Sequence, residues 1–407
     1  MRTHSLETDG SPSVETDVSP STHPFVDLSK PVMFAIRFFP PLHGGSSVIM
    51  KNLLGALPPD KVVVATVEAP NPVDSNFDYP VYRQMRQISF STRGNKILSQ
   101  LQINKTARTV ARLVKKHGCG AVVGVYPDIS FLAVAFRAAQ MAGVPFVPYL
   151  HDTVAEAMKG RMSAAFAARL QDQIFATCQD TFVMSEGMAD MYRAKYNLET
   201  RPLVHSYPED IPTEPPTEPP NGKGFWSGDI YAINKQAMVR VYSAMRDKKI
   251  ELTIASRQQP QTLQNMGFDR GGIKNTFFSD RTELVSALRE QSFLILALDQ
   301  PDEAVIHADE LSTIFPTKTI EYLASGRPIL LHCPEHYFLA RFCLRHDCAE
   351  VVADPSPGAL TSAFDRLQND PQRIDTLVRN GFKAARPFSR RAVAETFASG
   401  LETAWSR

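Results

Sequence analysis

The chain has 407 residues, which is longer than one compact core of usual size, so two domains are expected. Hydrophobic residues make up 43% and charged residues 21% of the sequence, a balance that excludes a largely disordered or collagen-like protein. No window approaches the roughly 20 apolar residues that span a bilayer, and the first residues lack the apolar core of a signal peptide. We therefore expect a cytoplasmic protein.

The net charge of +1 hides an uneven distribution along the chain. Residues 1–27 carry −4, residues 28–207 carry +8 and residues 208–407 carry −3. A basic first half favours an anionic partner such as a phosphate or a membrane surface. Nucleic acid is a weaker expectation, because the sequence contains no basic run and no zinc finger. The 5 cysteines contain no CxxC pair, so free thiols are expected rather than a metal site.

The first half of the chain reads as a tail followed by an α/β domain. Residues 1–27 are rich in Ser, Thr, Pro and acids, which predicts a disordered tail. Between residues 28 and 207, short apolar runs alternate with helical patterns, which is typical of a doubly wound parallel sheet. The expected strands are 32–39, 62–67, 121–126, 146–151 and 181–185, and the expected helices are 97–116, 131–141 and 164–176.

A second α/β domain is expected over residues 223–385. Before it, the prolines of PEDIPTEPPTEPP (208–220) fix φ and remove amide donors, which predicts an extended linker over 208–222. A last helix within 386–407 is expected to pack back on the first domain. The expected strands are 224–228, 251–256, 276–278, 293–298, 328–333 and 350–353, and the expected helices are 236–246, 282–290, 316–325, 335–345, 357–368 and 371–379.

A glycine pair follows the first expected strand. His43, Gly44 and Gly45 precede an amphipathic helix whose apolar positions include Val48 and Ile49. Glycines let a backbone approach a ligand closely, and the start of a helix offers unpaired N–H groups to an anion. A phosphate site and a plain tight turn explain this pair equally well.

The segment FPTKTIEYLASGRPILL (315–331) places several polar groups at the start of one helix. Pro316 suits the first helical position, Thr317 and Lys318 lie in the first turn, and Glu321 shares a face with Lys318. Ammonium and helix start together could bind a diphosphate, and the carboxylate could accept both hydroxyls of a ribose. A surface ion pair between Lys318 and Glu321 is an equal alternative.

Five segments in order resemble the GT-B glycosyltransferases of the large retaining group called family 4. They are FPPLHGG (39–45), FVPYLHDTVAEAM (146–158), FVMSEGMADMY (182–192), SGDIYAINKQAM (227–238) and FPTKTIEYLASGRPIL (315–330). The resemblance covers roughly residues 30 to 400. It implies an α/β GT-B fold, in which two Rossmann-like doubly wound domains face each other across a cleft. It also implies a nucleotide-sugar donor on the second domain and an acceptor on the first.

The resemblance assigns roles to individual residues. It implies catalytic roles for His151 near the reacting carbon, for Lys318 at the leaving diphosphate and for Glu321 at the ribose. Without it, His151 fits a structural histidine and Asp152 fits the cap of a following helix. The implied donor-binding residues are Gly44, Gly45, Ser227, Gly228, Arg257, Thr313 and Thr317.

Two positions depart from the pattern of the family. Thr313 stands where many members have a Glu that contacts the donor sugar, and Glu310 lies three residues earlier. Asp229 stands where many members have an Arg that is followed a few residues later by a Lys, and Lys235 and Arg257 are the candidate substitutes. Phosphate neutralisation is therefore expected to fall on Lys318.

The sequence and the resemblance together predict the reaction class. The expected reaction moves a sugar to an acceptor hydroxyl, with retention of configuration, in polysaccharide or glycoconjugate assembly. No DxD-type acidic pair is found where a strand faces the expected cleft, so no metal and no cofactor are expected. Rival interpretations are another GT-B enzyme, such as an epimerase or a phosphorylase, and a catalytically inactive scaffold. An oxidoreductase is disfavoured because no GxGxxG follows the first strand of either half.

Two basic segments bear on the acceptor and on localisation. The stretches 97–116 and 158–170 combine Lys and Arg with apolar or small residues. Such surfaces fit a carbohydrate or lipid-linked acceptor and peripheral contact with the inner face of the membrane. Solvated faces of a cytoplasmic enzyme explain them equally well.

Overall fold

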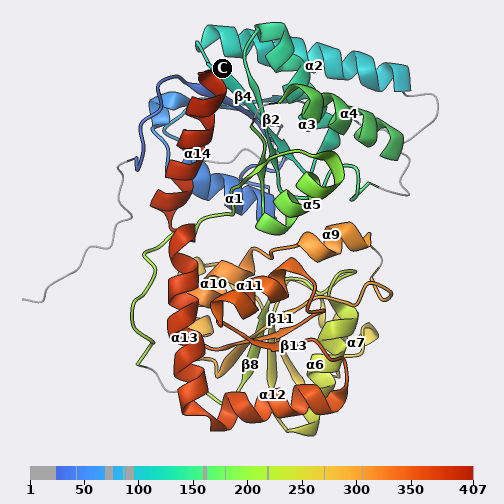
Figure 1. Cartoon of the computed structure of the whole chain (residues 1–407), viewed down its shortest axis with the longest axis vertical. Coiled ribbons are helices and arrows are strands. Elements are labelled where there is room, and N and C mark those ends of the chain that lie inside the picture. Colours follow the sequence, from blue (N-terminus) through green and yellow to red (C-terminus); the bar gives the residue numbers. More distant parts are fainter. Residues whose placement is uncertain are drawn as a thin grey trace, which may run out of the picture.

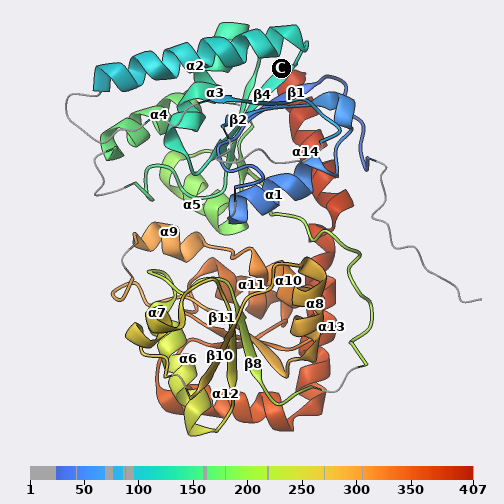
Figure 2. The same ribbon diagram turned by 180° about the vertical axis from the view of Figure 1, so that it is seen from behind.

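The structure of the chain is a computed structural model with two α/β domains stacked along its long axis (Figures 1 and 2). Residues 1–23 of the expected tail, His43 and residues 159–162 of the second basic segment lie outside the described residues. The structure describes residues 24–42, 44–68, 77–85, 88, 96–158, 163–178, 180–217, 220–269, 271–304 and 306–406.

The first domain is built on a sheet of seven parallel strands in the order β3-β2-β1-β4-β5-β6-β7. All residues of β1, β4 and β5 are buried, as expected of strands that helices cover on both faces. The strands are β1 (Val32–Ala35), β2 (Val62–Val67), β3 (Val81–Met85), β4 (Ala121–Tyr126), β5 (Phe146–Leu150), β6 (Phe182–Val183) and β7 (Arg201–Pro202). The helices are α1 (Gly45–Leu54), α2 (Lys96–Lys116), α3 (Ile129–Ala142), α4 (Ala164–Thr177) and α5 (Glu186–Tyr196).

The second domain contains a sheet of six parallel strands in the order β10-β9-β8-β11-β12-β13. Leu294 and Leu296 join one buried cluster and Phe293 and Ile295 join another, so β11 is covered on both faces. The strands are β8 (Gly224–Ser227), β9 (Leu252–Ala255), β10 (Ile273–Thr276), β11 (Phe293–Ala297), β12 (Ile329–His332) and β13 (Glu350–Val352). Its helices are α6 (Lys235–Asp247), α7 (Pro260–Asn265), α8 (Arg281–Glu290), α9 (Ala308–Thr313), α10 (Lys318–Ala324), α11 (Phe338–His346), α12 (Pro357–Asn369) and α13 (Pro371–Ala385). The last helix of the chain, α14 (Arg390–Trp405), belongs to the core of the first domain.

Several expected element boundaries are wrong. The first strand ends at Ala35 rather than at residue 39. Phe39 lies in the turn region after the strand, and its side chain is buried there. Helix α10 begins at Lys318, so Pro316 is not its first residue. Helix α11 begins at Phe338 because a turn precedes it, in which the Tyr337 amide donates to the Pro334 carbonyl oxygen.

The last two helices run along one side of the molecule and pass from the second domain to the first (Figure 1). Helix α14 packs on the first sheet, where the ring of Phe397 lies 5.7 Å from Phe34 and 5.3 Å from Phe182. At Gly400 a Cβ atom would lie only 2.4 Å from the ring of Phe182, so the helix approaches the sheet closely there. No helix in the described ranges is long and apolar enough to cross a bilayer.

Candidate active site

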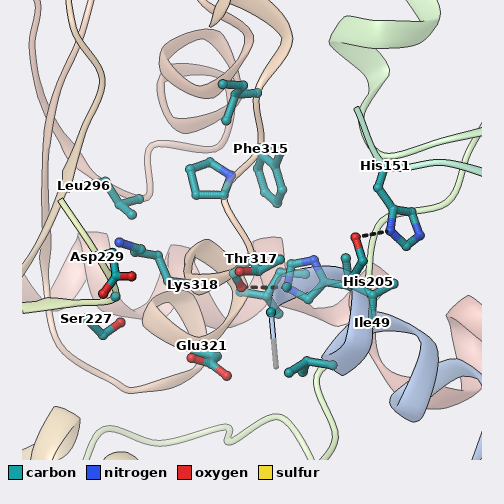
Figure 3. Close-up of a pocket in the computed structure, with 18 of the residues that line it drawn as sticks. Ile49, His151, His205, Ser227, Asp229, Leu296, Phe315, Thr317, Lys318 and Glu321 are labelled. Atoms are coloured by element: carbon teal, nitrogen blue, oxygen red, sulfur yellow. Dashed lines mark hydrogen bonds between the residues drawn. The ribbon is translucent and has the colours of Figure 1, made fainter. Parts of the chain in front are cut away.

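A cavity of about 920 Å³ lies between the two domains (Figure 3). Parallel strands end at this level in both sheets, which is where open α/β sheets bind ligands. The cavity brings together residues from both halves of the sequence. Its lining includes all ten site residues expected from the sequence: Gly44, Gly45, His151, Ser227, Gly228, Arg257, Thr313, Thr317, Lys318 and Glu321.

Helix α1 points its first turn into this cavity. Gly44 precedes the helix with φ of 135°, a conformation that favours glycine, and its carbonyl accepts the Ser47 and Val48 amides. A Cβ atom on Gly45 would lie 3.4 Å from the methyl group of Thr317, so the two domains nearly touch there. The first N–H groups of such a helix suit an anion.

His151 directly follows β5 on the first-domain side of the cavity (Figure 3). Its Nδ1 lies 2.9 Å from the Ser46 hydroxyl, and its buried Nε2 has no hydrogen-bond partner among the described residues. Burial, with His205 nearby, lowers the pKa of His151 to about 3, so the imidazole is neutral. Asp152 does not cap a helix, because the next helix begins only at Ala164.

His205 is a site residue that the sequence did not indicate. Its Nε2 donates to the Thr317 carbonyl oxygen over 2.6 Å, so a first-domain side chain bonds to the turn before α10. Burial lowers the pKa of His205 to about 4, and its Nδ1 has no partner among the described residues. A lone histidine after the two-residue strand β7 carries no pattern from which this position could be predicted.

Lys318 and Glu321 do not form the alternative ion pair with each other. The Lys318 ammonium lies over the ring of Trp226, 3.3 Å from its centroid. Burial lowers the pKa of Lys318 to about 7, while the carboxylates of Glu321 and Asp229 act in the opposite direction. Glu321 instead accepts a hydrogen bond of 2.5 Å from Arg281.

The backbone N–H groups of the turn after β8 are hydrogen-bonded to other groups of the protein. The Ser227 N–H donates to the Tyr322 hydroxyl and the Gly228 N–H donates to the Ala255 carbonyl oxygen, each over 2.8 Å. Neither N–H group is therefore available to a phosphate. Of the polar groups beside this turn, the Ser227 hydroxyl and the ammonium of Lys318 can still donate.

Glu310, which is buried, and Asp152, which is partly buried, bring two carboxyl groups to the cavity from opposite domains. Glu310, on α9 of the second domain, accepts hydrogen bonds from the amide and the hydroxyl of Thr153 in the first domain, the former over 3.0 Å. Burial and then the charge of Asp152 raise the pKa of Glu310 to about 8. Burial also raises the pKa of Asp152. Such a pair holds a proton near neutral pH and can donate as well as accept.

The remaining expected residues take several positions at the cavity. The Arg257 guanidinium stacks on the exposed ring of Phe277, 4.6 Å from its centroid. Thr313 donates its hydroxyl to the Glu310 carbonyl oxygen, and its own carbonyl accepts from Ser185 across the domains. No group of three or more His, Cys, Asp or Glu side chains within the described ranges could hold a metal ion.

Two Rossmann-like domains with a cavity between them define the GT-B architecture, and solved structures share it. The sequence matches no family model and no curated protein. The chain is similar to a sucrose-phosphate synthase from Thermosynechococcus elongatus, with a TM-score of 0.68 at 13% identity over 93% of this chain and 99% of that chain. A glycosyltransferase from Rickettsia africae gives a TM-score of 0.65 at 12% identity over 93% and 98%.

Anabaena HepE, solved in complex with UDP-glucose, gives a TM-score of 0.64 at 13% identity, over 92% of this chain and 99% of that chain. At such low identities the likeness concerns the fold. The chain has the GT-B fold, and the prediction of two Rossmann-like domains facing each other across a cleft is confirmed.

Proposed function

We propose that the protein is a glycosyltransferase that moves a sugar from a nucleotide-diphosphate donor to an acceptor hydroxyl. The observation that carries the proposal is the convergence of an ammonium, a carboxylate and a glycine-led helix start on one interdomain cavity. The GT-B fold is shared with HepE, whose structure contains UDP-glucose. These groups match the charged and hydroxylated parts of such a donor.

The donor would lie mainly on the second domain. Lys318 would neutralise the diphosphate as it leaves, and the first turn of α1, entered through Gly44 and Gly45, would face the same group from the first domain. Glu321 keeps one carboxylate oxygen free of Arg281, and this oxygen would accept a ribose hydroxyl. Glu310 lies one turn before Thr313 on α9 and would contact the sugar in its place.

The reaction would proceed without an enzyme nucleophile. The resemblance to family 4 implies retention of configuration: the acceptor oxygen attacks the anomeric carbon from the side of the leaving diphosphate, and a diphosphate oxygen takes the acceptor proton. Neutral His151 would contact the transferred sugar through its free Nε2. The proposal requires neither a metal nor a cofactor, because Lys318 and the helix start face the developing negative charge.

The acceptor would be a carbohydrate or a lipid-linked molecule in polysaccharide or glycoconjugate assembly. Helix α2 contains no Asp or Glu, and its exposed face combines Leu98 and Leu101 with Lys105, Arg108 and Arg112. Apolar side chains beside cations suit the surface of an anionic membrane. This helix would hold the enzyme at the inner face of the membrane.

The site is tested by Lys318→Ala and Glu321→Ala, assayed with a donor chosen from a thermal-shift screen of nucleotide diphosphates. Each variant should lose at least 90% of transferase activity while its thermal unfolding stays that of the wild type. Lys274→Ala removes an exposed cation from β10 and should leave activity unchanged. Full turnover in both site variants contradicts the assignment, and a wild-type chain that binds neither UDP nor GDP favours a scaffold.

A sugar-nucleotide epimerase is the second candidate. The carboxyl groups of Asp152 and Glu310 favour it, because their raised pKa values suit proton transfer to and from a sugar carbon. Product analysis without an acceptor separates the two: an epimerase converts the nucleotide sugar alone, whereas a transferase needs the acceptor.

A further inference from the structure

Trp226 contacts both the phosphate-side turn and the lysine of the candidate site. It is the third residue of β8, and its side chain is 1% exposed. Its indole N–H donates to the Gly228 carbonyl oxygen over 2.8 Å. The face of the same ring carries the Lys318 ammonium, 3.3 Å from the centroid.

The turn that Trp226 closes is fixed from several directions. Gly228 has φ of 93°, and its N–H is bonded to β9 through the Ala255 carbonyl oxygen. The Tyr322 hydroxyl, one turn after Lys318 on α10, accepts the Ser227 N–H. The turn and the helix are therefore joined, and a Cβ atom on Gly228 would lie 3.4 Å from the lysine Nζ.

Within the described part of the chain, the Lys318 ammonium makes no hydrogen bond or ion pair. The nearby carboxylates have partners of their own: Glu321 accepts from Arg281 and Asp229 accepts from Ser256. The attraction between the ammonium and the indole face is thus the contact that fixes the end of a flexible side chain. It uses none of the lysine N–H bonds for a conventional acceptor, so they can point to oxygen atoms of a ligand.

We infer that Trp226 is a positioning residue for anion binding: it holds the Lys318 ammonium beside the Gly228 turn, where phosphate oxygens would meet it. The inference rests on the proposed function only for the class of ligand, a nucleoside diphosphate. Trp226 would act on the ligand only through the position of the Lys318 ammonium, without touching the ligand itself.

The first test compares the affinity for UDP and for inorganic pyrophosphate by calorimetry. Trp226→Leu removes the aromatic face and should weaken binding about tenfold, close to the loss in Lys318→Met. Trp226→Phe keeps a ring and should recover most of the affinity. In the double variant Trp226→Leu/Lys318→Met the loss should not exceed that of Lys318→Met, because Trp226 acts through the lysine.

The second test does not require a substitution of Trp226. The chain has 2 tryptophans, so Trp405→Phe leaves Trp226 as the one indole reporter. Titration with UDP or pyrophosphate should change its emission as the ammonium shifts toward the anion, and Lys318→Met in the same background should abolish the change.

Each outcome decides the inference. Unchanged affinity in Trp226→Leu, multiplied losses in the double variant or an emission change that survives Lys318→Met overturns it. If Trp226→Leu does not fold, the emission test alone decides. A chain that binds UDP but transfers no sugar refutes the proposed function and leaves the inference standing. A chain that binds neither UDP, GDP nor pyrophosphate refutes both.

Discussion

At the scale of single residues, the protonation of Lys318 sets a pH limit on anion binding. Burial lowers its pKa to about 7, so the ammonium is present below that pH and is lost as the pH rises. A diphosphate prefers the protonated form. UDP affinity should therefore fall as the pH rises above the pKa and level off about tenfold lower, near that of Lys318→Met, which calorimetry between about pH 6.5 and 9 measures.

Lys318→Met serves as the matched control for this pH profile. Its affinity for UDP should be low and nearly constant over the same range, because the titrating group is absent. A wild-type affinity that does not change up to about pH 9 would show that another group binds the anion.

Gly228→Ala tests the phosphate-side turn. The residue has φ of 93°, and a new Cβ atom would lie 3.4 Å from the Lys318 Nζ. We expect a loss of about 1 to 3 kcal/mol in stability and at least tenfold weaker UDP binding. Gly118→Ala is the control, because Gly118 has φ of 61° but no atom within 4 Å of its added Cβ. It should lose stability yet keep its UDP affinity; equal losses of affinity would contradict the site.

The sequence was most informative where a residue carries chemistry in a short motif. Lys318, Glu321 and the glycine pair could be selected because charge and glycine next to a helix start suit an anion, with an ion pair and a tight turn as equal alternatives. Trp226 and Arg281 could not be selected. Their importance comes from partners far away in sequence, such as the Arg281 contact with Glu321, and an aromatic residue inside an apolar strand fits the core equally well.

At the scale of elements, α2 provides the test of membrane contact. Lys105→Glu/Arg112→Glu replaces two exposed cations and should reduce flotation with phosphatidylserine liposomes, by about fivefold for each cation removed. Phosphatidylcholine liposomes should bind neither protein. Lys274→Glu changes an exposed cation on the second domain and should float like the wild type. If both variants float equally, α2 is a solvated face.

The success of element prediction depended on length and burial. Strand β4 was predicted with its full range because a run of buried apolar residues ends on both sides at polar or turn residues. Strand β10 was expected three residues late, since three of its four residues are polar, none is buried and the apolar pair at 277–278 follows it. Helices α7 and α9 are each 6 residues long, too short to show a helical period.

At the scale of the whole molecule, Glu310 makes the association of the domains sensitive to pH. An acid whose pKa is raised on folding binds its proton more tightly when folded. The stability it contributes is therefore present below its ordinary value of 4.5 and is lost as the pH rises through about 8. Glu310→Gln keeps an oxygen acceptor for Thr153 without the charge.

The difference in Tm between Glu310→Gln and the wild type should consequently increase from about pH 5 to 8, in favour of the variant, as measured by scanning fluorimetry. Glu283→Gln, an exposed carboxyl on α8, should show a constant difference. A difference that decreases with pH would mean that Glu310 is stabilised as a carboxylate.

The architecture of the whole chain was predictable because two alternations of strand and helix admit few arrangements. The close contact between the two domains was not predictable from the sequence. It depends on contacts such as His205 with the Thr317 carbonyl oxygen and Ser185 with the Thr313 carbonyl oxygen, which join residues 112 and 128 positions apart. The hydrophobic periodicity of a sequence gives no information on contacts between residues so far apart.

Both covalent crossings between the domains lie along one side of the molecule (Figure 1). The linker and the start of α14 meet there, where the Tyr207 amide donates to the Phe388 carbonyl oxygen. A rotation of the two domains about this edge would therefore separate them most on the opposite side of the molecule. Two ion pairs between the domains, Arg345 with Glu186 and Lys195 with Asp309, are exposed, so water and salt weaken them.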